Sequence, residues 1–234
     1  MDWDLITNSI LFNPAEWEIV LNEWPRFMRG FSNTLTLFAV SVVGAFLLGA
    51  VIVNLMASRN PSVRAAGRVY VDGMRMLPFL IFAYLLYYGL PSLGIRMSAW
   101  TAGLLGLILY HAAYVAEILR GAWSQLPAGQ TEAARAMGFH GPQLFLRIVL
   151  PQLVLGSAPI LGNQLIYMLK DTAFLMIITV QDLTYAANSV QSMYFVPLQP
   201  FIVAIGLYWI STLAIEGLVF LVGRFARKRG LGRA

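Results

Sequence analysis

Long stretches without any charged residue are the feature that most constrains this chain of 234 residues. Residues 31–56, 76–95 and 97–116 contain no Asp, Glu, Lys or Arg, and residues 198–222 contain only Glu216. A helix of about 20 apolar residues crosses a hydrocarbon core of about 30 Å. The whole composition agrees, because 12% of the residues are charged, whereas soluble domains contain about 25%.

A fifth apolar region, residues 148–181, is interrupted only by the adjacent pair Lys170 and Asp171. It is too long for one upright span, so part of it is expected to lie along the membrane interface. The apolar runs are continuous and do not alternate with polar residues, which favours helices over a β-barrel. The sequence therefore predicts an all-α integral membrane protein with five transmembrane helices.

Basic residues are distributed unevenly between the segments that connect these runs. Most of the 16 Lys and Arg residues lie in residues 57–75, in residues 120–147 and after residue 222. By the positive-inside rule these segments are cytoplasmic. The acidic segment 1–30 is then outside and the tail 229–234 inside, so the N-terminus is outside and the C-terminus is cytoplasmic. The basic residues of these cytoplasmic segments account for the net charge of +5. The charge is therefore no reason to expect a nucleic acid partner.

A polar segment at residues 127–151 separates two apolar regions and must lie outside the lipid. The sequence predicts a helix over residues 124–137, with Pro127 near its start and Gly138 in the left-handed conformation after its end. A second helix is expected to start at Gly141. From the residues alone, this compact knob either binds a partner on the water side or rests on the membrane as an amphipathic loop.

Residues 127–151 also resemble the EAA loop of permease subunits in bacterial ABC importers, the loop that docks on the ATPase. The matching positions are Glu132, Ala133, Ala134, Gly138, Ile148, Leu150 and Pro151. The subfamily that imports polar amino acids adds a Pro-x-Gly-Gln sequence, which is matched by Pro127, Gly129 and Gln130. The resemblance implies ATPase coupling by Gln130, Glu132, Ala133, Ala134 and Gly138.

The similarity to this subfamily extends over nearly the whole chain. It implies a five-helix permease domain over residues 31–228, with a cytoplasmic coupling loop at residues 122–151. Further matches are Gly30 with Thr34-Leu35, Ala113-Tyr114 with Ala116-Glu117, Asn163-Gln164, and Leu169-Lys170-Asp171-Thr172. Residues 72–78 depart from the family pattern: Met76-Leu77 replaces the usual Gly-Thr before Pro78, which leaves the substrate less defined.

The resemblance implies the type I ABC importer permease fold and a multi-pass protein of the bacterial inner membrane. Its expected partners are ABC ATPase subunits, a second permease chain (the same or homologous), a periplasmic solute-binding protein and a substrate such as histidine, glutamine, glutamate, arginine or an opine. The chain has no G-x-x-x-x-G-K-[ST] phosphate loop, so ATP and Mg are expected on the ATPase and no cofactor here.

Two other classes of function compete with the permease. An intramembrane enzyme would need a nucleophile or an acid pair, but the sequence has no G-x-S-x-G, no H-E-x-x-H and no cysteine, so we expect no enzyme. A self-contained oligomeric channel or regulator would leave the polar segment at residues 127–151 without a role. His111 and His140 have no partners at metal-ligand spacing, so no metal site is predicted.

Polar residues inside the predicted spans are candidates for substrate contact. Placing a charged side chain in the membrane costs free energy, so a charged residue there is expected to have a function. A zwitterionic amino acid requires an anion for its ammonium group and a cation for its carboxylate. The candidates are Asp171, Lys170, Thr172, Asn163 and Gln164. Alternatively, Lys170 or Asp171 pairs with a neighbouring helix and fixes the packing. Glu117 and Arg120, three residues apart, are expected to form a local ion pair or a gate contact.

Overall fold

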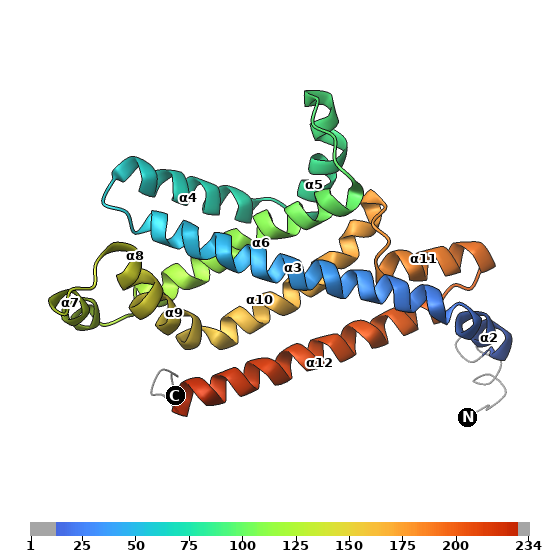
Figure 1. The fold of residues 1–234 in the computed structure, drawn as a ribbon. Coiled ribbons are helices and arrows are strands. Elements are labelled where there is room, and N and C mark those ends of the chain that lie inside the picture. Colours follow the sequence, from blue (N-terminus) through green and yellow to red (C-terminus); the bar gives the residue numbers. More distant parts are fainter. Residues whose placement is uncertain (1–12, 229–234) are drawn as a thin grey trace.

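The computed structural model describes residues 13–228, and within this range every regular element is a helix (Figure 1). The tail 229–234 and the first part of the predicted segment 1–30 lie outside the described residues. The elements are α2 (Pro14–Asn22), α3 (Trp24–Met56), α4 (Pro61–Met76), α5 (Phe79–Tyr84), η2 (Leu85–Gly89), η3 (Leu90–Leu93), α6 (Ala99–Trp123), α7 (Ala128–Ala136), α8 (Gly141–Leu144), η4 (Phe145–Val149), α9 (Leu150–Gly156), α10 (Ala158–Asp171), η5 (Thr172–Ile178), α11 (Leu183–Tyr194) and α12 (Gln199–Lys228).

The long helices run side by side along the length of the molecule (Figure 1). Helix α3 packs against α4 and α6, and α10 packs against α6 and α12. Helices α2 and α11 lie at one end of this bundle, and α7 and α8 lie at the opposite end, the end at which α12 finishes (Figure 1). The segment predicted to couple to an ATPase is therefore separated by the length of the bundle from the N-terminal side.

Three helices of the described chain are long and apolar enough to cross a membrane: Trp24–Met56, Ala99–Trp123 and Gln199–Ala226. Two bent pairs pass the same test when each is taken as one span. They are Pro61–Met76 with Phe79–Leu93, bent by 104°, and Gly141–Gly156 with Ala158–Ile178, bent by 73°. The described chain therefore has three candidate spans, or up to five if each bent pair is one span.

The first long helix begins seven residues earlier than the uncharged run at residues 31–56, at Trp24. Its first turn includes Arg26, whose Nε lies 2.8 Å from a carboxylate oxygen of Glu23. The Arg26 guanidinium also donates a 2.7 Å hydrogen bond to the Ser189 hydroxyl of α11. The charge-free run marks the apolar part of α3 and not its start, because ion pairing and hydrogen bonding accommodate the arginine in the first turn.

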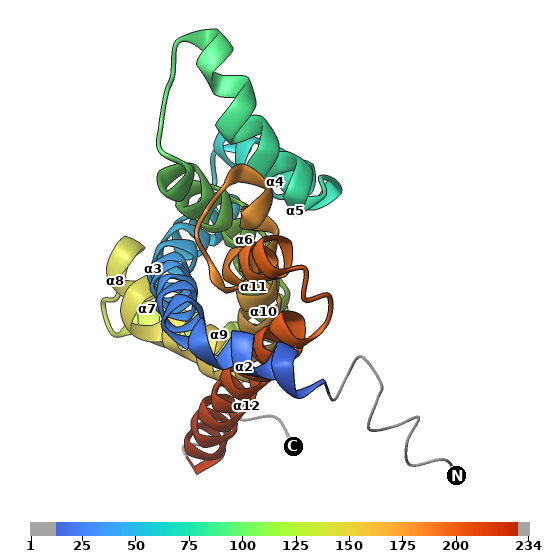
Figure 2. The same ribbon diagram turned by 90° about the vertical axis from the view of Figure 1, so that its right-hand side faces the viewer.

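The arginine-rich segment after α3 forms helix α4, which packs on α3 and α6. The Tyr70 hydroxyl donates a 2.6 Å hydrogen bond to the Leu109 carbonyl of α6. Helix α4 ends at Leu77, whose extended backbone is typical of a residue before proline. Pro78 is the N-cap of α5, a position near a helix start where proline is tolerated. Helix α5 packs against α6 and η5, and beyond it the chain projects away from the other helices at η3 in both views (Figures 1 and 2).

Glycines allow close contact between neighbouring helices at several points in the bundle. A Cβ atom at Gly49 of α3 would lie 2.7 Å from a methyl group of Val115 on α6. A Cβ atom at Gly162 of α10 would collide with the side chain of Val219 on α12. Small residues of this kind are typical of helix interfaces in membranes, where close packing replaces the hydrophobic driving force.

Asp182 is the N-cap of α11, and its carboxylate accepts a 2.7 Å hydrogen bond from the backbone N–H of Tyr185. The side chain is fully buried, and burial raises the pKa of the Asp182 carboxyl to about 6 from an ordinary 3.8. Between pH 4 and pH 6 the native state therefore holds a proton that the unfolded chain has released. The free energy of unfolding should fall as the pH rises through this window, by at most about 3 kcal/mol.

We expect Asp182→Asn to remove this part of the pH dependence and to raise the melting temperature above pH 6, because an amide keeps the capping oxygen without a buried charge. Thermal melts of the detergent-solubilised protein between pH 4 and pH 8 measure the effect. Asp72→Asn, at an exposed position of α4, is the control. Equal slopes for wild type and Asp182→Asn would contradict the interpretation.

Candidate functional site

The coupling segment, residues 127–151, forms two helices joined by a tight turn. Helix α7 starts at Ala128, so the predicted start at residue 124 was wrong; the extended backbone of Pro127 delays it. Gly138 has a φ of +88°, which confirms the predicted left-handed turn, and Gly141 has a φ of +52°. The second helix begins at Gly141, as predicted.

Helix α7 is attached to the bundle by one face. Ala134 is only 6% exposed and lies in an apolar cluster with Val53 of α3 and with Val115 and Leu119 of α6. Four other predicted coupling residues are exposed: Gln130, Glu132, Ala133 and Gly138. Next to them, Met137 is 79% exposed. The segment therefore buries one face and presents to the surroundings a free face of small, polar and charged residues and one methionine.

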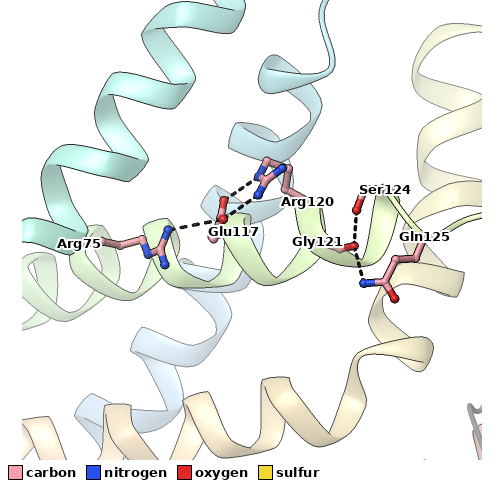
Figure 3. A network of polar contacts seen from close by, with 6 residues as sticks. All are labelled: Arg75, Glu117, Arg120, Gly121, Ser124 and Gln125. Carbon is pink, nitrogen blue, oxygen red and sulfur yellow. Dashed lines mark hydrogen bonds and ion pairs between the residues drawn. The ribbon is translucent and has the colours of Figure 1, made fainter.

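Glu117 and Arg120 of α6 form the predicted local pair, with two hydrogen bonds of 2.7 and 2.8 Å from the guanidinium to the carboxylate (Figure 3). The structure adds Arg75, at the end of α4, which lies 3.5 Å from the same carboxylate. The Arg75 guanidinium also lies over the ring of Tyr114, 5.7 Å from its centroid. Because Arg75 is far from Glu117 in the sequence, no local spacing pointed to this link between α4 and α6.

A cavity of about 330 Å³ joins this ion-pair cluster to the coupling segment. Its lining is rich in amide side chains: Gln125 of the α6–α7 connection, Gln130 of α7 and Gln152 of α9. The Gln125 amide donates to the Gly121 carbonyl, which also accepts from Ser124 (Figure 3). Glu117 lines the same cavity, so the predicted gate residue and the predicted coupling residue Gln130 share one pocket.

The five residues predicted to contact substrate are divided between two faces of α10 and its continuation. Asn163 and Lys170 are exposed, whereas Gln164 and Thr172 are buried. The Asp171 side chain, 19% exposed, lies between these groups. Lys170 and Asp171 form no pair with each other among the ion pairs of the described residues; side chains of adjacent residues point about 100° apart on a helix.

The exposed residues of α10 and η5 form a continuous stripe with alternating spacings of three and four residues. We call it the α10 stripe; its members are Ile160, Asn163, Tyr167, Lys170, Phe174 and Ile177. This spacing places them on one side of the helix. Asn163 also lines a cavity of about 370 Å³ with Glu216 of α12. The polar Asn163 and the charged Lys170 thus lie on the outer surface of α10.

His111 of α6 is the residue that the sequence interpretation missed. The Gln164 amide nitrogen lies 2.7 Å from its Nδ1, and the Asp171 Oδ2 lies 3.3 Å from its Nε2. His111 and Gln164 are 53 residues apart, and no local pattern signalled the contact. Two predicted substrate residues and one unassigned histidine thereby form one cluster. Within the described residues, no three His, Asp or Glu side chains are placed to hold a metal ion.

Comparisons with known proteins agree with this arrangement. Over 210 residues the chain is 30% identical to the probable glutamine ABC transporter permease protein GlnM of Bacillus subtilis strain 168, covering 89% of this chain and 97% of the relative. It is 31% identical over 214 residues to the nopaline transport system permease protein NocM of Agrobacterium fabrum strain C58, covering 87% and 89%.

Among solved structures, the crystal structure of an amino acid ABC transporter with histidines is similar, with a TM-score of 0.78 and 32% sequence identity. The similarity covers 88% of this chain and 96% of that one. Residues 45–228 match the family described as binding-protein-dependent transport system inner membrane component. On this match and on the relatives at 30% identity, the chain belongs to the family of binding-protein-dependent inner membrane transport components.

Proposed function

We propose that the chain is the transmembrane subunit of an ATP-driven importer for a polar amino acid or an amino-acid derivative such as an opine. The observation that carries the proposal is the coupling segment, which is attached by Ala134 and exposes Glu132, Ala133 and Met137 at one end of the bundle. A short helix with small exposed side chains can enter a cleft on an ATPase that larger side chains would block. Relatives named as amino-acid and nopaline permeases support the substrate class.

The proposed topology is five spans in the bacterial inner membrane, with the N-terminus outside. The two bent pairs supply the second and fourth spans. The uneven distribution of lysine and arginine supports a cytoplasmic position for the coupling segment and for the end of α12. Both lie at the same end of the bundle (Figure 1), as a single cytoplasmic side requires.

A second permease chain, identical or homologous, is proposed to face the α10 stripe. Lys170 and Asn163 in this stripe are exposed, and placing a lysine against hydrocarbon costs a few kcal/mol. A water-filled path between two permease chains removes this cost. The stripe would then line the path, with Lys170 as a partner for the substrate carboxylate and Asp171 as a partner for its ammonium group. The rival role for Asp171, fixing α10 to α6, is supported by its proximity to His111.

The remaining proposed partners are ABC ATPase subunits, which bind ATP and Mg, and a periplasmic solute-binding protein, which delivers the substrate. This subunit is proposed to be non-catalytic. Closure of the ATPases on ATP would move the coupling segment and change which side of the membrane the path faces.

The test is to purify the tagged chain in mild detergent, identify co-purifying subunits by mass spectrometry and reconstitute the complex in proteoliposomes. We expect recovery of an ATPase and ATP-dependent uptake of a radiolabelled amino acid when solute-binding protein is present. Recovery of the chain alone, with substrate flux that does not require ATP, would overturn the importer and favour an oligomeric channel.

A further inference from the structure

His111 occupies an unusual place for a polar side chain. It lies within α6 and is 1% exposed. Its ring centroid is 5.4 Å from that of Tyr110, 6.1 Å from that of Phe79 and 6.4 Å from that of Tyr114. Buried ring nitrogens need partners, and the backbone groups of a helix interior already bond to each other. The side chains next to the two ring nitrogens therefore define what His111 does.

The partner of Nδ1 is the side-chain amide of Gln164 on α10. The amide nitrogen lies 2.7 Å from Nδ1, and with the amide in this orientation it can only donate. Nδ1 must then be the unprotonated nitrogen, which leaves the proton of the neutral ring on Nε2. Gln164 is itself buried, with 8% exposure. The contact between two buried side chains thus selects one tautomer of His111.

The other nitrogen, Nε2, faces Asp171. It lies 3.3 Å from Oδ2, within ion-pair distance, yet among the described residues it has no aligned hydrogen-bond acceptor. The Nε2–H group is thus directed into the space beside the carboxylate. Asp171 is partly exposed, and the described ion pairs give it no lysine or arginine partner. The Asp171 carboxylate therefore lies next to His111 and keeps a part of its surface exposed.

We propose that His111 is a positioning residue for a cation-binding carboxylate in the translocation path. Gln164 sets the tautomer of His111, and His111 Nε2–H orients Asp171 so that one carboxylate oxygen binds the ammonium group of the transported amino acid. The inference rests on the proposed function, since it requires a substrate with a cationic group. A neutral donor suits this role because it fixes the carboxylate without neutralising it, whereas a lysine or arginine would compete with the substrate.

Two substitutions of His111 by amide residues test the roles of its two ring nitrogens separately. In His111→Gln the amide nitrogen can take the place of Nε2, next to Asp171, whereas in His111→Asn the shorter amide can replace only Nδ1, next to Gln164. The full complex in proteoliposomes, with solute-binding protein, is assayed for ATP-dependent uptake of radiolabelled glutamine, histidine and arginine. We expect His111→Gln to keep most of the maximal rate and His111→Asn to lose about tenfold, because only the glutamine keeps a polar donor within reach of the Asp171 carboxylate.

A double-mutant cycle with Asp171→Asn tests whether His111 acts through Asp171. In the Asp171→Asn background, His111→Gln and His111→Asn should transport at equal rates. Ser41→Ala, which removes a buried hydroxyl without a hydrogen-bond partner in α3, controls for the loss of any buried polar group. Recovery of the ATPase with each variant controls for assembly.

The outcomes distinguish this inference from the function on which it rests. Normal wild-type uptake combined with equal rates for His111→Gln and His111→Asn would overturn the role of His111 alone. A difference between the two variants that persists at full size without the Asp171 carboxylate would also overturn it. The wild-type complex is assayed in the same way with glutamate and an opine, and absence of ATP-dependent uptake of all five compounds would overturn both the proposed function and this inference.

Discussion

Ala134→Arg is expected to abolish ATP-driven transport while leaving the chain in the membrane. Ala134 is 6% exposed in an apolar cluster that also contains residues of α3 and α6, and α7 packs on α8 and η4. An arginine there would need several times the volume of a methyl group and would bury a charge without a partner, so the segment must detach. Uptake and ATPase activity of the reconstituted complex measure the effect: uptake should be lost, and ATP hydrolysis should no longer respond to the loaded binding protein.

Ala133→Arg is the matched comparison, because Ala133 is adjacent and exposed. Its coupling segment should stay attached to the bundle while its contact with the ATPase is blocked. Limited proteolysis distinguishes the two variants: Ala134→Arg should be cut rapidly within residues 127–151, and Ala133→Arg should be cut at the wild-type rate. Normal uptake by Ala134→Arg would show that the buried face of α7 is not needed for coupling.

Gly162→Leu is expected to prevent stable packing of α10 on α12. A Cβ atom at Gly162 already collides with the side chain of Val219, so a leucine must push the two helices apart. Overpacking of this kind costs about 1–3 kcal/mol or more. Displacement of α10 also moves Gln164 and Asp171. We expect a melting temperature lowered by several degrees in detergent, or no accumulation of folded protein, together with loss of uptake.

Two further variants make this prediction specific. Gly217→Leu adds the same side chain on α12 at a position where a Cβ atom meets nothing within 4 Å, and it should be tolerated. Combining Gly162→Leu with Val219→Ala removes part of the collision and should restore part of the lost stability. A melting temperature for Gly162→Leu equal to that of Gly217→Leu would contradict the packing shown by the structure.

Features fixed by neighbouring residues could be predicted from the sequence. The left-handed turn at Gly138 follows from a glycine after a run of helix-forming residues. The ion pair of Glu117 and Arg120 follows from a spacing of three on a helix. The extended backbone at Leu77 follows from the proline after it. In each case a local steric or electrostatic rule determines the geometry.

Features that depend on contacts between distant segments could not be predicted in this way. The 104° bend after α4 combines a local cause, Pro78, with a direction that only packing sets. The start of α3 at Trp24 depends on the bonds of Arg26 to Glu23 and to Ser189 of α11. In the candidate site, Asp171 could be singled out from the sequence because it is a charged residue inside an apolar run. The contact of His111 with Gln164 could not, because no residue near His111 in the sequence indicates it.

Helix α6 runs without a break from Ala99 to Trp123. Near one end, Leu119 packs in the cluster that holds the coupling segment; two turns further along the same rod lies His111, next to Asp171. Eight residues of α-helix span about 12 Å, and no hinge interrupts them. A displacement of the coupling segment would therefore reach His111 as a rigid movement of α6, and would pass to Asp171 on α10 only through the contact between these two side chains.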